Sequence, residues 1–176
     1  MNYATIKDYD IANGLGIRVS LFVSGCTHHC KGCFNEVAWD INYGDEFTKE
    51  IEDKIIKMLE PSYIKGLTLL GGEPFEVSNQ RCLIPFLRRV KELYPNKDIW
   101  AYTGYTLEDD LLKPSRARCE VTDEMLSYID ILVDGKFVLD LKDIALKFRG
   151  SSNQRIIDLK RTLNEKKTIL VENLMK

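Results

Sequence analysis

Three cysteines within eight residues are the strongest chemical signal in the sequence. Cys26, Cys30 and Cys33 follow the spacing CxxxCxxC, and His28 and His29 lie between the first two cysteines. Thiolates at this spacing can converge on one inorganic centre, and three of them leave a fourth ligand position open. An iron–sulfur cluster bound in this way keeps one iron free for a substrate or cofactor. The pattern therefore predicts a metal centre.

A zinc site is the main alternative on spacing alone. A tetrahedral zinc ion needs four ligands, and His28 or His29 could supply the fourth. Disulfides fit less well, because the number of cysteines is odd and the first ten residues are charged, unlike a signal peptide. We therefore expect a protein of the reducing cytoplasm. Cys82 and Cys119 have no partner at ligand spacing, and we expect them to be small buried hydrophobes.

Length and composition indicate one compact domain spanning residues 1–176. The hydrophobic content of 44% is sufficient for a buried core. The chain has 25 basic and 27 acidic residues, which argues against a surface that binds nucleic acid. No apolar stretch approaches the ~20 residues that cross a bilayer, so we expect no membrane segment.

Short apolar runs, each followed by a glycine, predict an α/β fold with a mostly parallel sheet. The glycines would gather at the carboxyl ends of the strands, where active sites of such folds lie. A sheet of about five strands cannot close an eight-stranded barrel, so we expect a partial (βα) barrel whose open side admits a polypeptide. The expected strands are 17–23, 66–70, 98–102, 129–133 and 168–171.

Four segments have helical spacing of apolar residues or a capping pattern. Pro85 should kink or split the second of these helices, because it removes one backbone hydrogen bond. The last two segments begin with threonine, which we expect to act as an N-cap. The expected helices are 45–59, 77–93, 106–112 and 122–128.

A second chemical signal, Gly71-Gly72-Glu73-Pro74, directly follows an expected strand. Two glycines let backbone groups approach a ligand closely, the carboxylate adds an acceptor, and proline fixes the turn. Taken alone, the motif is equally compatible with an ordinary strand-to-helix turn. Its position at the same sheet edge as the cysteines makes a shared site the stronger interpretation.

Together the CxxxCxxC and GGEP motifs resemble those of the radical S-adenosylmethionine enzymes. Within that family the sequence is most similar to the small activators of anaerobic ribonucleoside-triphosphate reductase. Gly32 supports this assignment, because many members place an aromatic residue before the third cysteine, whereas here the aromatic residue follows as Phe34. The other matching motifs are Asn13-Gly14-Leu15-Gly16-Ile17-Arg18, Ser20 to Gly25, Asn35 with Trp39, Asp134-Gly135-Lys136-Phe137 and Arg149 to Arg155.

The resemblance implies a 4Fe-4S cluster on the three cysteines, with the free iron chelated by the amino and carboxylate groups of S-adenosylmethionine. The turn of Gly71, Gly72, Glu73 and Pro74 would receive the cofactor's ammonium on carbonyl and carboxylate oxygens. Beside the ligand Cys33, the adenosyl part would contact Gly32 and Phe34. These implied contacts define the expected cofactor site.

The resemblance also implies the reaction and its partners. Reductive cleavage of the cofactor gives methionine and a 5′-deoxyadenosyl radical, which takes a hydrogen atom from a glycine in the large subunit of anaerobic ribonucleoside-triphosphate reductase. A one-electron donor such as flavodoxin or ferredoxin would reduce the cluster. No general base is required, so we assign no catalytic acid or base.

Several assignments stay open at the level of the sequence. Asp134 and Lys136 could contact the cofactor or form a polar turn, and the segment 149–155 could cap a helix or bind a ligand. His28 could donate to a cluster sulfur, whereas His29 is equally well explained as an exposed loop residue. The alternative functions are activation of another glycyl-radical enzyme, of the pyruvate formate-lyase type, and a zinc-stabilised binding module.

Overall fold

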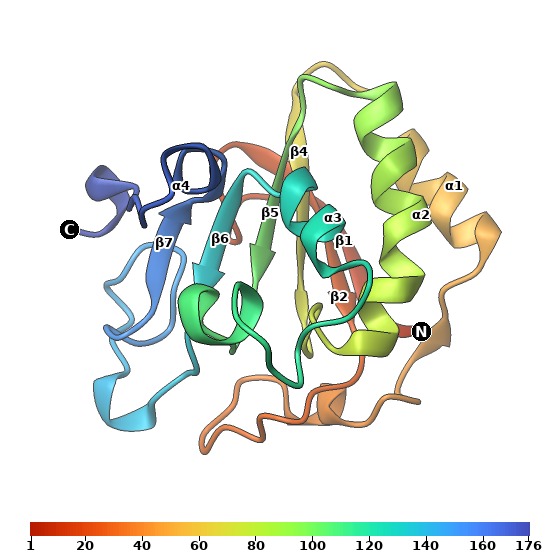
Figure 1. The fold of residues 1–176 in the computed structure, drawn as a ribbon. Helices are drawn as coiled ribbons and strands as arrows, with labels where there is room; N and C mark the ends of the chain where they lie inside the picture. The colour runs from red at the N-terminus through yellow and green to blue at the C-terminus, as the bar shows by residue number, and fades with distance from the viewer.

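The computed structural model describes all residues, 1–176, and contains one seven-stranded sheet flanked by helices (Figure 1). The strand order is β3-β1-β2-β4-β5-β6-β7. The pairs within β2-β4-β5-β6 are parallel, and the three pairs at the edges are antiparallel. The strands are β1 (Asn2–Asp10), β2 (Ile17–Val23), β3 (Asp45–Glu46), β4 (Ile64–Gly71), β5 (Asp98–Tyr102), β6 (Ile131–Asp134) and β7 (Arg155–Asp158).

The structure confirms an α/β fold and the four central strands, but the sheet is mixed and not mostly parallel. Strands β1, β3 and β7 were not predicted, because they are short or largely exposed and lack a continuous apolar run. The expected strand 168–171 is wrong: only an isolated bridge joins Leu170 to Ile157. The prediction therefore identified the buried centre of the sheet and missed its edges.

The helices broadly follow the expected segments, with changes at their ends. Thr48 is the N-cap of the first helix, since its side chain accepts from the amide of Ile51, so this helix begins at Lys49 and not at residue 45. The helices are α1 (Lys49–Met58), α2 (Val77–Leu93), α3 (Thr122–Tyr128) and α4 (Leu159–Glu165), with a π-helical turn at Leu107–Leu111 and 3-10 turns at Glu36–Trp39, Leu139–Leu141 and Glu172–Leu174.

Two details of the predicted helices differ in the structure. Pro85 does not split α2, which continues from Val77 to Leu93; Pro85 and Arg81 are both exposed, so water can bond to the carbonyl that proline leaves free. The expected threonine caps are also absent. Thr106 donates to the Asp110 carboxylate, and Thr122 lies inside α3.

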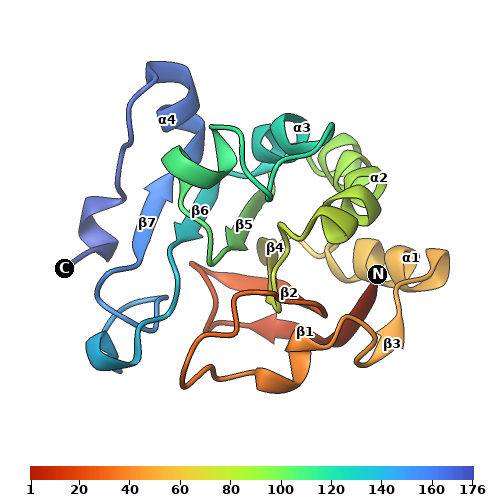
Figure 2. The ribbon, with the colours of Figure 1, turned by 60° about the horizontal axis from the view of Figure 1, so that its bottom comes forward.

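The two faces of the sheet have different environments. Helices α1, α2 and α3 lie on one face, where alternate strand residues such as Leu21, Leu67 and Leu69 join the main core (Figures 1 and 2). The opposite face carries a smaller cluster that includes Trp100 and Leu174, the latter from the C-terminal segment. Helices α1, α2 and α3 therefore leave this second face to the C-terminal segment and to the residues around Trp100.

None of the helices has the length and apolar character needed to cross a membrane.

A fully buried arginine holds the loop between β1 and β2 against this second face. The guanidinium of Arg18 pairs with Asp98 (Nη2 to Oδ1, 2.6 Å) and donates from Nε to the Thr68 hydroxyl at 2.8 Å. It also donates to the carbonyl of Leu15, and Thr68 donates to the carbonyl of Asn13. Burial lowers the pKa of Arg18, and the Asp98 carboxylate opposes this shift. The network fixes the position of residues that line the cavity.

Another ion-pair network joins β6, β7 and the π-helical turn. Arg155 donates to Asp134 at 2.5 Å and to Glu108 at 2.6 Å. Glu108 also accepts a short hydrogen bond from the Thr168 hydroxyl. These hydrogen bonds, Arg155 first, lower the pKa of Glu108 from 4.5 to about 2.

The lowered pKa of Glu108 predicts a specific loss of stability in acid. A carboxylate whose pKa is depressed by folding stabilises the native state above its unfolded pKa of 4.5, and this contribution disappears as the pH falls toward about 2. In Glu108→Gln, the decrease in melting temperature of the apoprotein over this range should be smaller than in the wild type. If calorimetry gives the same dependence of melting temperature on pH for the two proteins, the lowered pKa of Glu108 is contradicted.

Candidate functional site

The three cysteines lie in an irregular loop between β2 and the turn Glu36–Trp39. Backbone hydrogen bonds close this loop on itself: Gly25 donates to Ala38 at 2.8 Å, and Cys26 donates to Trp39 at 3.2 Å. Within the loop, the amide of Cys33 donates to the carbonyl of Cys30 at 3.1 Å. The loop is therefore held by its own main chain, with no helix or strand between residues 24 and 35.

Backbone amides point at the thiols within this loop. The amide of Asn35 donates to Cys33 Sγ at 3.4 Å, and the amides of His28 and His29 are directed at the thiol of Cys26. Burial nevertheless raises the pKa of Cys26 to about 11. A positively charged metal centre would reverse this shift, because coordination deprotonates a thiol. The environment thus favours a metal-bound thiolate over a free one.

A second chain segment reaches Cys30, which the sequence did not predict. The amide of Phe137 and the ammonium of Lys136, both from the loop after β6, lower the pKa of Cys30, although burial is the larger effect and raises it. Phe137 also packs against Phe34, with ring centroids 5.0 Å apart. Spacing could not reveal this contact, because more than a hundred residues separate the two loops.

All three cysteines line one cavity of about 590 Å³. This volume is within the usual range for small-molecule and cofactor sites. Among the residues predicted to bind the cofactor, Cys33, Phe34, Gly71 and Gly72 line the cavity. Gly32, Glu73 and Pro74 do not, so the structure brings together only part of the predicted set.

The two glycines of the GGEP turn let two loops approach each other. A Cβ on Gly72 would lie 2.5 Å from the carbonyl oxygen of Gly25 and 2.9 Å from that of Ala38. Gly71 adopts φ +109°, which is unfavourable for any side chain. The amide of Glu73 donates to the carbonyl of Gly25 at 2.7 Å. Glycine is thus required for contact with the cysteine loop, in addition to any contact with a ligand.

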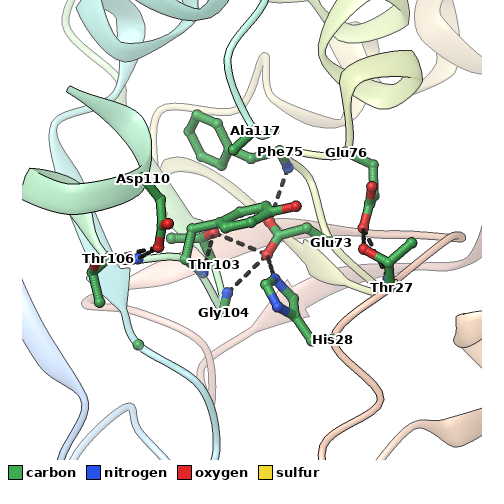
Figure 3. A network of polar contacts seen from close by, with 12 residues as sticks. Thr27, His28, Glu73, Phe75, Glu76, Thr103, Gly104, Thr106, Asp110 and Ala117 are labelled. Carbon is green, nitrogen blue, oxygen red and sulfur yellow. Dashed lines mark hydrogen bonds and ion pairs between the residues drawn. The ribbon is translucent and has the colours of Figure 1, made fainter. Parts of the chain in front are cut away.

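The Glu73 carboxylate is fully buried and does not line the cavity. Figure 3 shows it surrounded by its hydrogen-bond partners. Its Oε1 accepts from His28 Nε2 at 2.7 Å, from the Thr103 hydroxyl at 2.9 Å and from the Gly104 amide at 2.8 Å. Its Oε2 accepts from the Phe75 amide at 2.9 Å. Four internal donors occupy this carboxylate, so its placement does not match the expected contact with the cofactor's ammonium.

Both histidines have defined positions. The side chain of His28 is 3% exposed and packs edge-on against Tyr105 at 4.4 Å. A Cβ on Gly104 would lie 2.6 Å from the His28 ring, so glycine there makes room for the imidazole. His29 stacks on Trp39 at 4.3 Å. Glu73 occupies His28 Nε2, whereas His28 Nδ1 is buried without a partner and His28 lines the cavity.

The side chains do not form a preorganised site for one metal ion. No group of three or more His, Cys, Asp or Glu side chains lies close enough together to hold a single ion. A tetrahedral zinc ion requires its ligands to meet around one point. A cubane cluster distributes its thiolate ligands over separate iron corners, so three cysteines around a cavity suit it better.

Unpartnered polar atoms also indicate that the cavity binds a ligand. Four buried side-chain polar atoms of cavity residues have no hydrogen-bond partner. Such atoms are rare in proteins, because an unmade buried hydrogen bond is costly. A bound molecule with matching polar groups would satisfy them. The four atoms are His28 Nδ1, Trp39 Nε1, the Tyr102 hydroxyl and Arg149 Nε.

The structure places most of the remaining candidates in structural roles. Asp134 is buried and bonded to Arg155 and to the amide of Leu107 at 2.9 Å, outside the cavity lining. In the segment 149–155, Gln154 accepts from the amide of Gly150 at 2.9 Å. Much of the donor-rich character of that segment therefore stabilises its own loop.

Cys82 and Cys119 are half-buried and not fully buried as expected. Cys82 packs against the main core, and the Cys119 thiol donates to Gln80 at 3.6 Å. Neither cysteine lines the cavity. Both are therefore separate from the three-cysteine loop.

The sequence matches known proteins that bind an iron–sulfur cluster. A family model described as a 4Fe-4S single cluster domain matches residues 12–157, which include the whole cysteine loop. The proteins named anaerobic ribonucleoside-triphosphate reductase-activating protein are close relatives. That of Haemophilus influenzae is 48% identical over 158 residues, covering 89% of this chain and 97% of that protein.

Two further relatives have the same name. The protein of Escherichia coli (strain K12) is 46% identical over 162 residues, covering 91% of this chain and all of that protein. The protein of enterobacteria phage T4 is 42% identical over 156 residues, covering 89% of this chain and 93% of that protein. The chain therefore belongs to the family of anaerobic ribonucleoside-triphosphate reductase-activating proteins.

The Glu73 network predicts the effect of a nearly isosteric substitution. In Glu73→Gln, one carboxylate oxygen becomes an NH₂ group that faces a donor, which leaves a buried hydrogen bond unmade and costs about 1–3 kcal/mol. We expect a lower melting temperature and less iron bound per chain after anaerobic reconstitution. Thr106→Ser, outside this network, is the control; equal iron content and stability in all three proteins would show that the network does not organise the loop.

Proposed function

We propose that this protein activates anaerobic ribonucleoside-triphosphate reductase by radical S-adenosylmethionine chemistry in the cytoplasm. In this proposal residues 1–176 form one domain, a partial (βα) barrel of the radical S-adenosylmethionine type. The observation that carries the proposal is that one cavity is lined by the three cysteines, by the Gly71–Gly72 turn and by four residues with unpartnered polar atoms. The names of the relatives support the same partner.

We assign Cys26, Cys30 and Cys33 as the ligands of one 4Fe-4S cluster. When bound, the cluster supplies one electron that breaks a carbon–sulfur bond of S-adenosylmethionine. The chain's own contribution is to bind and orient these groups. The backbone amides directed at the thiols stabilise negative charge on the ligands.

The contacts of the cofactor are assigned to both main chain and side chains. Carbonyl groups of Gly71 and Gly72 would accept from its ammonium, and the ring of Phe34 would cover its adenosyl part beside Cys33. We assign Glu73 a positioning role, because its carboxylate acts through the loops that it joins. Gly32 and Pro74 are proposed to shape the same two loops.

The proposed substrate is a glycine in the large subunit of the reductase. When bound, S-adenosylmethionine would supply a 5′-deoxyadenosyl radical, which would take a hydrogen atom from the glycine Cα and leave the radical on the glycine. This transfer needs no general acid or base. We propose that a one-electron donor such as flavodoxin or ferredoxin reduces the cluster.

The decisive experiment is activation in the absence of air. The reconstituted protein, S-adenosylmethionine and a reductant would be mixed with the reductase large subunit or with pyruvate formate-lyase. We expect a glycyl radical by electron paramagnetic resonance with the reductase only. A radical on pyruvate formate-lyase alone would favour the other glycyl-radical function, and bound zinc without iron or sulfide would refute both.

Substitution of Cys26, Cys30 or Cys33 should prevent cluster binding, whereas substitution of Cys82 or Cys119 should not. Cys30→Ala removes one of three ligands and should abolish cluster assembly and formation of 5′-deoxyadenosine. Cys82→Ala is the matched control, because this cysteine lies outside the cavity. Iron and sulfide analysis gives the readout. Cofactor cleavage at the wild-type rate in Cys30→Ala would contradict the ligand assignment.

A further inference from the structure

The cavity has a second half that the proposed cofactor contacts leave unexplained. This second half lies directly beside the cysteines and the glycine turn, on the sheet face opposite α1, α2 and α3, which we call the inner face. Its walls include Phe22, Leu70 and Tyr102, at the carboxyl ends of three neighbouring parallel strands, and Phe148 from a loop. These walls are mainly apolar, and the three strand residues come from regular elements. They can hold a ligand in a fixed position beside the cysteine half.

Two donors in or next to this half have no partner. The Tyr102 hydroxyl and Arg149 Nε are both buried without a hydrogen bond. The other guanidinium nitrogens of Arg149 donate to the carbonyls of Ser152 (3.2 Å), Gln154 (2.9 Å) and Met175 (3.0 Å). The guanidinium is therefore fixed, and its Nε–H is the donor left over. Because an arginine Nε can only donate, the missing partner is an acceptor.

These groups select a particular class of ligand. The hydrogen bonds of Arg149 go to neutral carbonyls, so its charge stays in the cavity wall and disfavours an amine. Apolar walls disfavour a ligand with several charges. Main-chain carbonyl oxygens satisfy both conditions, and a polypeptide segment that enters a protein interior must find donors for them.

We propose that Tyr102 and Arg149 are positioning residues that hold main-chain carbonyl groups of the reductase's glycine-bearing segment against the inner sheet face. This inference rests on the proposed function and names the part of the site that receives its protein substrate. Two fixed donors along a short segment would orient one Cα–H bond toward the cofactor half. Correct orientation at the reacting atom is a major source of rate in such sites.

The test is the substitution Tyr102→Phe, which removes only the hydroxyl. The measurement is the number of glycyl radicals formed on the reductase per 5′-deoxyadenosine produced. Loss of one hydrogen bond to the segment should lower this ratio about five- to tenfold and raise the KM for the reductase. The melting temperature should not fall, because the hydroxyl has no partner in the free protein. This readout separates positioning from a structural role.

The matched control is Tyr128→Phe. The Tyr128 hydroxyl bonds to Glu124 at 2.8 Å within α3, outside the cavity, so its removal should leave the ratio unchanged. A second variant, Arg149→Lys, keeps the charge but lacks the Nε donor, and should also lower the number of glycyl radicals per 5′-deoxyadenosine. It also loses the carbonyl hydrogen bonds that fix the guanidinium, so Tyr102→Phe is the deciding variant.

Two results would overturn the proposal. One is an unchanged ratio and KM in Tyr102→Phe. The other is weaker S-adenosylmethionine binding in this variant, measured by equilibrium dialysis, with an unchanged ratio, since that would assign Tyr102 to the cofactor. A wild-type protein that forms no 5′-deoxyadenosine would instead refute the proposed function, and that failure is visible before any variant is compared.

Discussion

One buried carboxylate connects the three segments that build the site. Glu73 comes from the turn after β4, His28 from the loop after β2, and Thr103 and Gly104 from the end of β5. Hydrogen bonds to a charged acceptor are strong in a low-dielectric interior, and each one left unmade is costly. The relative positions of the cysteine loop, the glycine turn and the third strand end are therefore coupled through this residue.

The coupling matters because the cysteine loop has little regular structure of its own. Its shape depends on a few backbone hydrogen bonds, on the absence of a side chain at Gly72, and on the packing of its own His28 against Tyr105. A site of this kind must hold its ligands in place before the metal arrives, and supporting contacts achieve this as much as the ligands do. Sheet, turn and loop thus act as one rigid support.

The sequence allowed the central strands and the cysteines to be predicted, because both depend on local pattern. Continuous apolar runs identify strands buried on both faces, and CxxxCxxC predicts from spacing that three cysteines share a site, which agrees with their lining one cavity. The position of the Glu73 carboxylate could not be predicted in this way. Its partners His28 and Gly104 lie 45 and 31 residues away, so only the folded chain reveals that the carboxylate is occupied. The contact of Phe137 with Cys30 was hidden for the same reason.

The unpredicted edge of the sheet shapes the half of the cavity that we assign to the protein substrate. Strand β7 pairs antiparallel to β6 and leads the chain into a C-terminal segment that packs on the inner face, where Leu174 contacts the cluster around Trp100. The carbonyl of Met175 accepts from Arg149 and thereby helps to fix its guanidinium. No residue from 155 to 176 lines the cavity, so this segment acts on the cavity through Arg149. The antiparallel edge therefore supports the site from behind its lining residues.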